Sequence, residues 1–158
     1  MHDDVPGTGH GFVDILDPTT NVITRLITGS AAGGTVTQLD SPWGLTLAPA
    51  GFGQFANDLL VSNFGNGEIN AFNPMTGAFL GAISDTNNNP IINPGLWALA
   101  FGNGGTGFNA NALYFTAGGA DEMSGVFGRI AVVPEPATLA LLGVGLAGLG
   151  FSRCRNLS

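Results

Sequence analysis

The chain has 158 residues, enough for one domain of ordinary size, and 44% of them are hydrophobic. Charged residues make up only 9%, against about 25% in a typical soluble domain, and the net charge is −7 with no lysine in the sequence. This acidic balance argues against a nucleic-acid partner. The single cysteine, Cys154, excludes an internal disulfide and any multi-cysteine metal site.

Residues 1–10 are predicted to form an N-terminal tail. Met1 is followed by His2, Asp3 and Asp4, with neither a basic nor an apolar stretch, so no signal peptide is visible in this chain. His2 and His10 are the only histidines, and a Ser-His-Asp triad therefore cannot be assembled within the body that follows.

An internal repeat begins after this tail. Residues 11–28 align without a gap on residues 67–84, with Gly, Asp or Asn, Pro, Thr and Ile recurring in register. Each copy reads as a strand, a turn rich in Pro, Thr and Gly or Asn, and a second strand. We therefore expect two equivalent β-hairpins.

A second match relates the segments between and after these hairpins. Trp43-Gly-Leu-Thr-Leu-Ala aligns with Trp97-Ala-Leu-Ala-Phe-Gly, and Asn57-Asp-Leu-Leu-Val-Ser aligns with Asn111-Ala-Leu-Tyr-Phe-Thr. These short, mostly apolar runs predict strands that are buried on both faces. The complete unit then has strands at residues 44–48, 59–64, 68–73 and 78–83, preceded by half a unit at 12–28 and followed by strands at 98–101, 113–117 and 126–133.

Four-stranded units that repeat at this spacing are typical of β-propeller blades. Residues 11–133 would form an all-β partial propeller of about two and a half blades; a solenoid or sandwich with accidental similarity is the alternative. Since a closed ring needs at least four blades, we expect exposed strand edges, and a partner chain or missing blades to close the propeller. The recurrence of Trp43 and Trp97 predicts that both pack in the core.

Several segments of the body resemble the C-terminal half of an uncharacterised exported bacterial family with NHL-like propeller repeats. The resemblance is carried by Ser41-Pro-Trp-Gly-Leu, Asn63-Phe-Gly-Asn-Gly-Glu-Ile-Asn-Ala-Phe and Gly95-Leu-Trp-Ala-Leu-Ala-Phe-Gly-Asn-Gly-Gly. It implies a propeller fold and an exported protein, and it assigns no activity. Because the family's N-terminal half has no counterpart here, we expect the chain to be a piece of a longer exported protein.

Composition changes abruptly near the C-terminus. Val133, Pro134, Glu135 and Pro136 form an extended segment, and residues 137–152 then run without a charge, which as a helix would span about 24 Å. Arg153 and Arg155 follow in the basic tail 153–158. We predict a single transmembrane helix with its C-terminal end in the cytoplasm and the β body outside; a buried hairpin or an amphipathic helix of the domain is the alternative.

The order of Pro-Glu-Pro, apolar span and basic tail resembles the PEP-CTERM sorting signal, which would occupy residues 134–158. The resemblance implies recognition of Pro134, Glu135 and Pro136 by an exosortase-type membrane protease. It also implies export, at least transient anchoring in the inner membrane, and delivery to the cell surface or the extracellular space.

Asp85, Asn87 and Asn89 have the alternating spacing of a calcium loop. Pro90 stands where that loop requires glycine and Leu96 where it requires glutamate, so a polar loop between blades is the favoured interpretation and a weak calcium site the alternative. Asp58, Asn63 and Asn111 lie at predicted strand ends, where gluconolactonase-like propellers gather calcium ligands; asparagines in such places usually satisfy turns, which is the favoured interpretation, and a metal site is the alternative.

The sequence as a whole favours a non-enzymatic, cell-surface protein of the extracellular matrix or envelope, with no cofactor. An exported, metal-dependent propeller hydrolase of the gluconolactonase type is one alternative. A truncated fragment without independent function is another.

Overall fold

The computed structural model describes residues 6–119 and 121–132, which form an all-β structure with two short 3-10 turns, η1 (Ser30–Ala32) and η2 (Gly53–Phe55). The strands are β1 (Phe12–Leu16), β2 (Ile23–Thr28), β3 (Pro42–Leu47), β4 (Leu59–Asn63), β5 (Ile69–Phe72), β6 (Phe79–Ala82), β7 (Leu96–Phe101), β8 (Ala112–Ala117) and β9 (Val126–Ala131). Each lies within two or three residues of a predicted strand, so the all-β prediction is confirmed.

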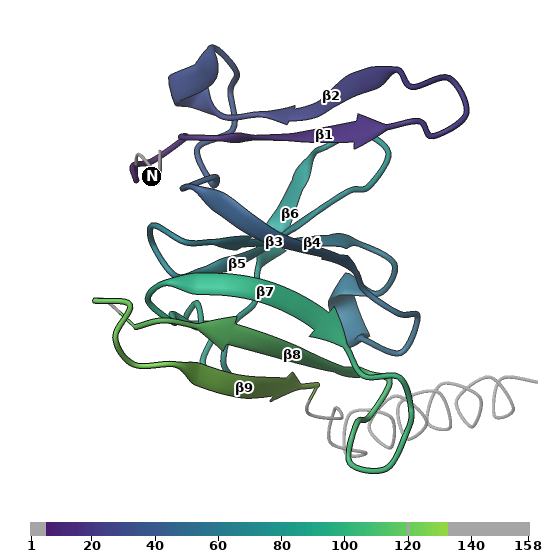
Figure 1. The fold of residues 1–158 in the computed structure, drawn as a ribbon, viewed down its shortest axis with the longest axis vertical. Coiled ribbons are helices and arrows are strands. Elements are labelled where there is room, and N and C mark those ends of the chain that lie inside the picture. The colour runs from purple at the N-terminus through teal and green to yellow at the C-terminus, as the bar shows by residue number, and fades with distance from the viewer. Residues whose placement is uncertain (1–5, 120, 133–158) are drawn as a thin grey trace, which may run out of the picture.

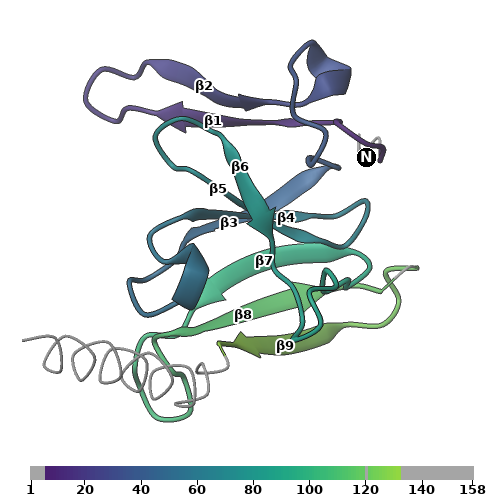
Figure 2. The same ribbon diagram turned by 180° about the vertical axis from the view of Figure 1, so that it is seen from behind.

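The strands form three antiparallel sheets that follow the chain in order. The first sheet pairs β1 with β2, the middle sheet has the order β3-β4-β5-β6, and the third has the order β7-β8-β9. Figures 1 and 2 show the middle sheet lying between the other two. The predicted four-stranded unit is therefore one complete sheet, with a two-stranded sheet before it and a three-stranded sheet after it.

The two repeated hairpins have the same turn geometry. In β1–β2, Asp17 Oδ1 accepts a hydrogen bond from Thr19 N at 2.8 Å, and in β5–β6, Asn73 Oδ1 accepts one from Met75 N at 2.9 Å. The backbone N–H groups of Asn21 and Gly77 close the turns, and both residues have positive φ, 56° and 68°. Asx side chains and a left-handed position are what such turns require, so the sequence repeat is also a structural one.

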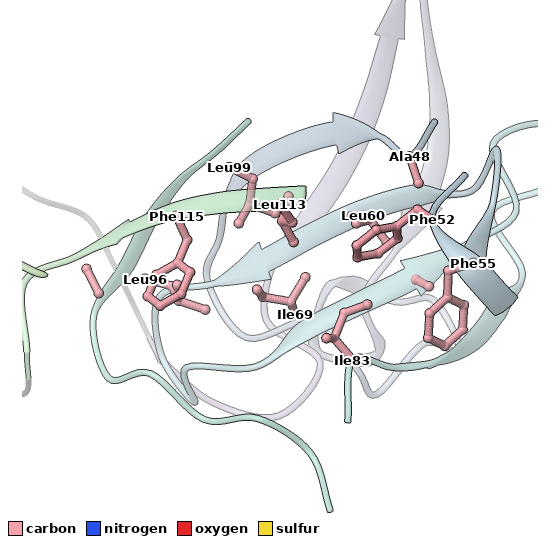
Figure 3. Packing of buried hydrophobic residues seen from close by; sticks show 12 residues of the cluster. Ala48, Phe52, Phe55, Leu60, Ile69, Ile83, Leu96, Leu99, Leu113 and Phe115 are labelled. Atoms are coloured by element: carbon pink, nitrogen blue, oxygen red, sulfur yellow. The ribbon is translucent and has the colours of Figure 1, made fainter. Parts of the chain in front are cut away.

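Two layers of buried side chains hold the sheets together. The larger one lies between the middle and third sheets, and Figure 3 shows its residues converging from both, among them Leu60, Ile69, Leu113 and Phe115. The smaller one lies between the first and middle sheets and includes Val13, Ile27, Leu39, Val61 and Phe72. β4 and β8 are buried on both faces, as predicted, and β5 is buried in the same way. The same prediction is wrong for β3 and β7, each of which has exposed as well as buried residues.

The middle and third sheets approach most closely where β3 meets β7. The pairing of β3 with β4 is irregular between Pro42 and Leu45, and the Gly44 N–H there donates to Ser62 Oγ at 2.9 Å. The Ser62 hydroxyl lies 3.0 Å from the Trp97 carbonyl of β7, to which it can donate. The third sheet repeats half of this arrangement: its first pair is irregular between Leu96 and Leu99, and the Ala98 N–H donates to Thr116 Oγ1 at 3.2 Å.

The prediction that both tryptophans pack in the core is wrong for Trp43. Its side chain is 53% exposed, with its ring 6.1 Å from that of Phe64, because the irregularity in β3 turns Gly44 rather than Trp43 towards the third sheet. Trp97 is half-buried and lies against Gly118, where an added Cβ would come within 2.7 Å of the Trp97 ring.

The predicted transmembrane helix, residues 137–152, lies outside the described residues. Within residues 6–119 and 121–132, no helix is long and apolar enough to cross a membrane.

We predict that Gly44→Ala lowers the free energy of unfolding by about 1–3 kcal/mol, as overpacking of a close contact does. A Cβ at this position would lie 2.4 Å from the Trp97 carbonyl oxygen and 2.7 Å from Ser62 Oγ, neither of which can move without disturbing the sheets. Urea denaturation followed by tryptophan fluorescence measures the effect. Gly125→Ala is the matched control, since nothing lies within 4 Å of its Cβ; equal losses in the two variants would contradict the close contact.

Candidate functional site

The predicted sorting residues Val133, Pro134, Glu135 and Pro136, and the basic residues Arg153 and Arg155, lie outside the described residues. The structure does describe the strand to which they are attached. β9 ends at Ala131, so a single residue, Val132, separates the edge strand of the third sheet from the motif. One residue spans at most about 3.6 Å, so the body and the motif are closely tethered.

The loop that contains Asp85, Asn87 and Asn89 folds around the Asp85 carboxylate. Asp85 Oδ1 accepts hydrogen bonds from Asn87 N at 2.8 Å and Asn89 N at 2.9 Å, and Asp85 N donates to the Asn89 carbonyl at 2.8 Å. The Asn89 N–H, followed by that of Asn87, lowers the pKa of the Asp85 carboxyl below 3.8. This geometry fits the predicted polar loop, because backbone donors already occupy the oxygen that a calcium ion would need.

The structure separates Asp58 from Asn63, two of the three other candidate metal ligands. Asp58 precedes β4 and Asn63 ends it, which places them about 16 Å apart along a five-residue strand. Asn63 is fully buried, whereas Asn111 is exposed at the start of β8. The three residues therefore do not form one ligand set, because Asp58 and Asn63 lie at opposite ends of β4.

Asp58 borders an open depression of about 510 Å³ between η2 and β6. Its lining includes Gln54, Phe55, Leu80 and Ser84, so Asp58 is the one ionisable side chain among the residues that line it. Across the part of the chain that the structure describes, no three His, Cys, Asp or Glu side chains are grouped closely enough to hold a metal ion.

The most organised polar site is a pair of buried amides that sequence reasoning missed. The Nδ2 groups of Asn63 and Asn70 both donate to the Gln38 carbonyl, at 2.7 and 2.8 Å, and Asn63 Oδ1 accepts a hydrogen bond from Asp40 N at 3.1 Å. These bonds fix the loop that leads from the first sheet into β3. Asparagine is depleted in strands, so its presence in two buried strands was the signal available in the sequence.

A comparison with protein families identifies the C-terminal segment. Residues 132–155 match the family described as the PEP-CTERM protein-sorting motif. The match covers the Pro-Glu-Pro segment, the apolar span and both arginines of the tail. It supports an exported protein that is sorted by an exosortase-type system to the cell surface.

Two curated relatives come from Acanthamoeba polyphaga mimivirus. Uncharacterized protein R648 is 31% identical over 126 residues, which cover 80% of this chain and 28% of the relative. Uncharacterized protein R640 is 36% identical over 66 residues, which cover 42% of this chain and 11% of the relative. The chain thus spans less than a third of either relative's length. No solved structure matches it significantly.

We expect Asn63→Ala to lower the free energy of unfolding by about 2–3 kcal/mol, because the Asp40 N–H would lose its partner in a buried layer and the Gln38 carbonyl would lose one of its two donors. Urea denaturation measures the change. Gln54→Ala is the matched control, since Gln54 is an exposed amide and its loss should change stability by no more than about 0.5 kcal/mol. An Asn63→Ala variant as stable as the control would show that the amide does not hold the loop.

The Asp85 carboxyl should titrate below 3.8 in the folded chain. Because the pKa is lowered on folding, the charged carboxyl stabilises the folded loop at any pH above the pKa of the unfolded chain. This contribution is lost as the pH falls through the folded pKa. The amide proton shifts of Asn87 and Asn89, followed by NMR from pH 6 to pH 2, report the transition.

Asp85→Asn should abolish that transition, and a midpoint at or above 3.8 would contradict the hydrogen-bonded loop. Calcium added at neutral pH tests the alternative interpretation in the same spectra. A bound ion must displace the backbone donors and shift these two amides, whereas unchanged shifts at millimolar calcium would reject a site at this loop.

Proposed function

We propose that this chain is a non-enzymatic exported protein that an exosortase-type membrane protease recognises at Pro134, Glu135 and Pro136. The observation that carries the proposal is the match of residues 132–155 to the PEP-CTERM protein-sorting motif. Residues 137–152 would hold the chain in the inner membrane, and Arg153 and Arg155 would keep its C-terminal end in the cytoplasm. The β body would then face outward, in the extracellular matrix or the envelope.

We further propose that the three sheets are successive blades of a β-propeller. Three features support this arrangement: the sheets are stacked in chain order, the middle sheet is a simple up-and-down meander, and its first strand approaches the first strand of the next sheet at Gly44 and Trp97. Strands that converge in this way are expected near the axis of a propeller.

The polar side chains favour a binding or structural role over catalysis, because most of them are already hydrogen-bonded within the fold. Asp85 is engaged by its own loop, Asn63 and Asn70 hold a buried connection, and Asp58 stands alone at its depression. Each of these polar groups therefore has a structural task or no chemical partner in the part of the chain that the structure describes.

Sorting is tested by fractionating cells that express the chain behind a supplied signal peptide in a host with an exosortase-type protease. We expect the full chain to be membrane-associated, accessible to protease added outside the cell, and then shortened. A chain ending at residue 133 should be released without passing through the membrane fraction. Glu135→Ala should accumulate at the membrane in its uncut form, because the motif would lose its only charge.

Glu68→Ala is the matched control, since it removes a carboxylate from the β body and leaves the motif intact. If the full and shortened chains fractionate alike, residues 134–158 are not a membrane signal. If Glu135→Ala and Glu68→Ala are processed equally, the protease does not read the motif at Glu135. Either result would contradict the proposal.

A further inference from the structure

The outward-facing side of the third sheet repeats a surface that is buried elsewhere in the same chain. The sequence repeat places Tyr114 and Thr116 of β8 at the positions of Leu60 and Ser62 of β4. Strand pairing extends the equivalence to the next strand: Leu60 and Ser62 pair with Ala71 and Ile69 of β5, while Tyr114 and Thr116 pair with Arg129 and Phe127 of β9.

The same positions differ sharply in burial. Leu60, Ser62, Ile69 and Ala71 are each 0% exposed, because the third sheet covers that face of the middle sheet. Phe127, at the position of Ile69, is 65% exposed. The third sheet therefore carries a face of the kind that packs against another sheet, with its largest apolar side chain uncovered.

The first sheet carries the opposite kind of face. Residues 12–16 of β1 align on residues 68–72, so Leu16 stands at the position of Phe72, which is 0% exposed because it packs between the middle and first sheets. Leu16 itself is 57% exposed. Phe12, 50% exposed, and the ion pair of Asp14 with Arg25 are the other large features of this surface, and the Arg25 guanidinium lies 3.8 Å from the centre of the Phe12 ring.

We propose that these two faces pack head to tail between two copies of this chain, with β9 of one copy lying on β1 of the other. Each face is one half of a sheet-on-sheet contact that the chain already makes internally, so the proposed interface continues an existing one. The proposal does not depend on how the chain is sorted.

Three details favour a second copy as the occupant. The first sheet has only two strands and would cover only β9 and the adjoining part of β8. The strand left uncovered, β7, turns the small side chains Ala98 and Ala100 outward. Tyr114 is only 8% exposed, because its ring packs against those of Phe108 and Phe127 and its hydroxyl donates to Gly107 O and accepts from Asn109 N.

Charge is also complementary at the proposed contact. Arg129 is exposed on the third sheet beside Phe127. In the β1–β2 hairpin Asp14 is paired with Arg25, which leaves Asp17 as the carboxylate that can face Arg129. A head-to-tail contact uses two different faces and closes into a ring only if the rotation between copies allows it. Two copies would bring together about five repeat units, within the four to eight blades that propellers contain.

Sedimentation of the full chain in a mild non-ionic detergent tests the proposal, since any association through the C-terminal segment is then common to all variants. We expect the parent chain to be dimeric at micromolar concentration. Leu16→Asp and Phe127→Asp should each weaken the dimer at least about tenfold, as loss of a central apolar anchor does. Both side chains are more than half exposed, so folding should be retained, and circular dichroism checks this.

Mixing the two variants distinguishes head-to-tail packing from every other arrangement. Each variant keeps the face that the other has lost, so a mixture should form a heterodimer although neither variant dimerises alone. Met75→Asp, a change at an 85% exposed side chain in the β5–β6 turn, is the matched control and should sediment like the parent.

Three outcomes would overturn the proposal. A monomeric parent chain would mean that a second copy does not cover these faces, which another part of a longer polypeptide could then occupy. Loss of the dimer in Phe127→Asp alone, without rescue by mixing, would indicate a symmetric contact of the third sheet with itself. A dimer that neither variant weakens would form through a different surface.

Discussion

The close approach of β3 to β7 is the constraint on which the arrangement of the sheets depends. A carbonyl oxygen of one sheet lies where the side chain of the other would begin, so the contact requires glycine at position 44. The Ser62 hydroxyl then accepts from its own sheet and reaches the Trp97 carbonyl of the next. The single proton of this hydroxyl can go to the Trp97 carbonyl at 3.0 Å or to the Gly44 carbonyl of its own sheet at 3.3 Å, and the shorter bond links the two sheets. The apolar layer of Figure 3 can pack only when that spacing is kept.

The two layers between the sheets hold the structure in different ways. Between the middle and third sheets the contact is apolar, and it gains stability from the area removed from water. Between the first and middle sheets the apolar cluster is smaller, and the buried amides of Asn63 and Asn70 supplement it by gripping one carbonyl of the connecting loop. A buried amide is stabilising only when its partners are in place. Both polar atoms of Asn63 have partners, whereas Asn70 Oδ1 is buried without one among the described residues. The position of the first sheet therefore depends on these hydrogen bonds as well as on the apolar area buried against the middle sheet.

The strands and hairpins could be predicted from sequence because their determinants are local. Asp17 and Asn73 each begin a turn, and each side chain accepts a hydrogen bond from a backbone N–H of that turn. Five consecutive residues are therefore enough to predict the turn. The environment of Trp43 was not predictable in the same way, since an irregular pairing with β4 decides which side of β3 faces the core. The structural role of Asn63 was not predictable either, because its partners, Gln38 and Asp40, lie in a loop more than twenty residues away. Asp58 and Asn63 differ in their surroundings because they lie at opposite ends of β4, which their residue types do not reveal.

The attachment of the sorting motif to β9 links the fate of the C-terminus to that of the third sheet. With Val132 alone between them, a chain held in the membrane would keep the third sheet within a few residues of the bilayer. Cleavage at the motif would therefore release the third sheet from the bilayer, whereas the proposed contact between two copies requires neither the anchor nor its removal.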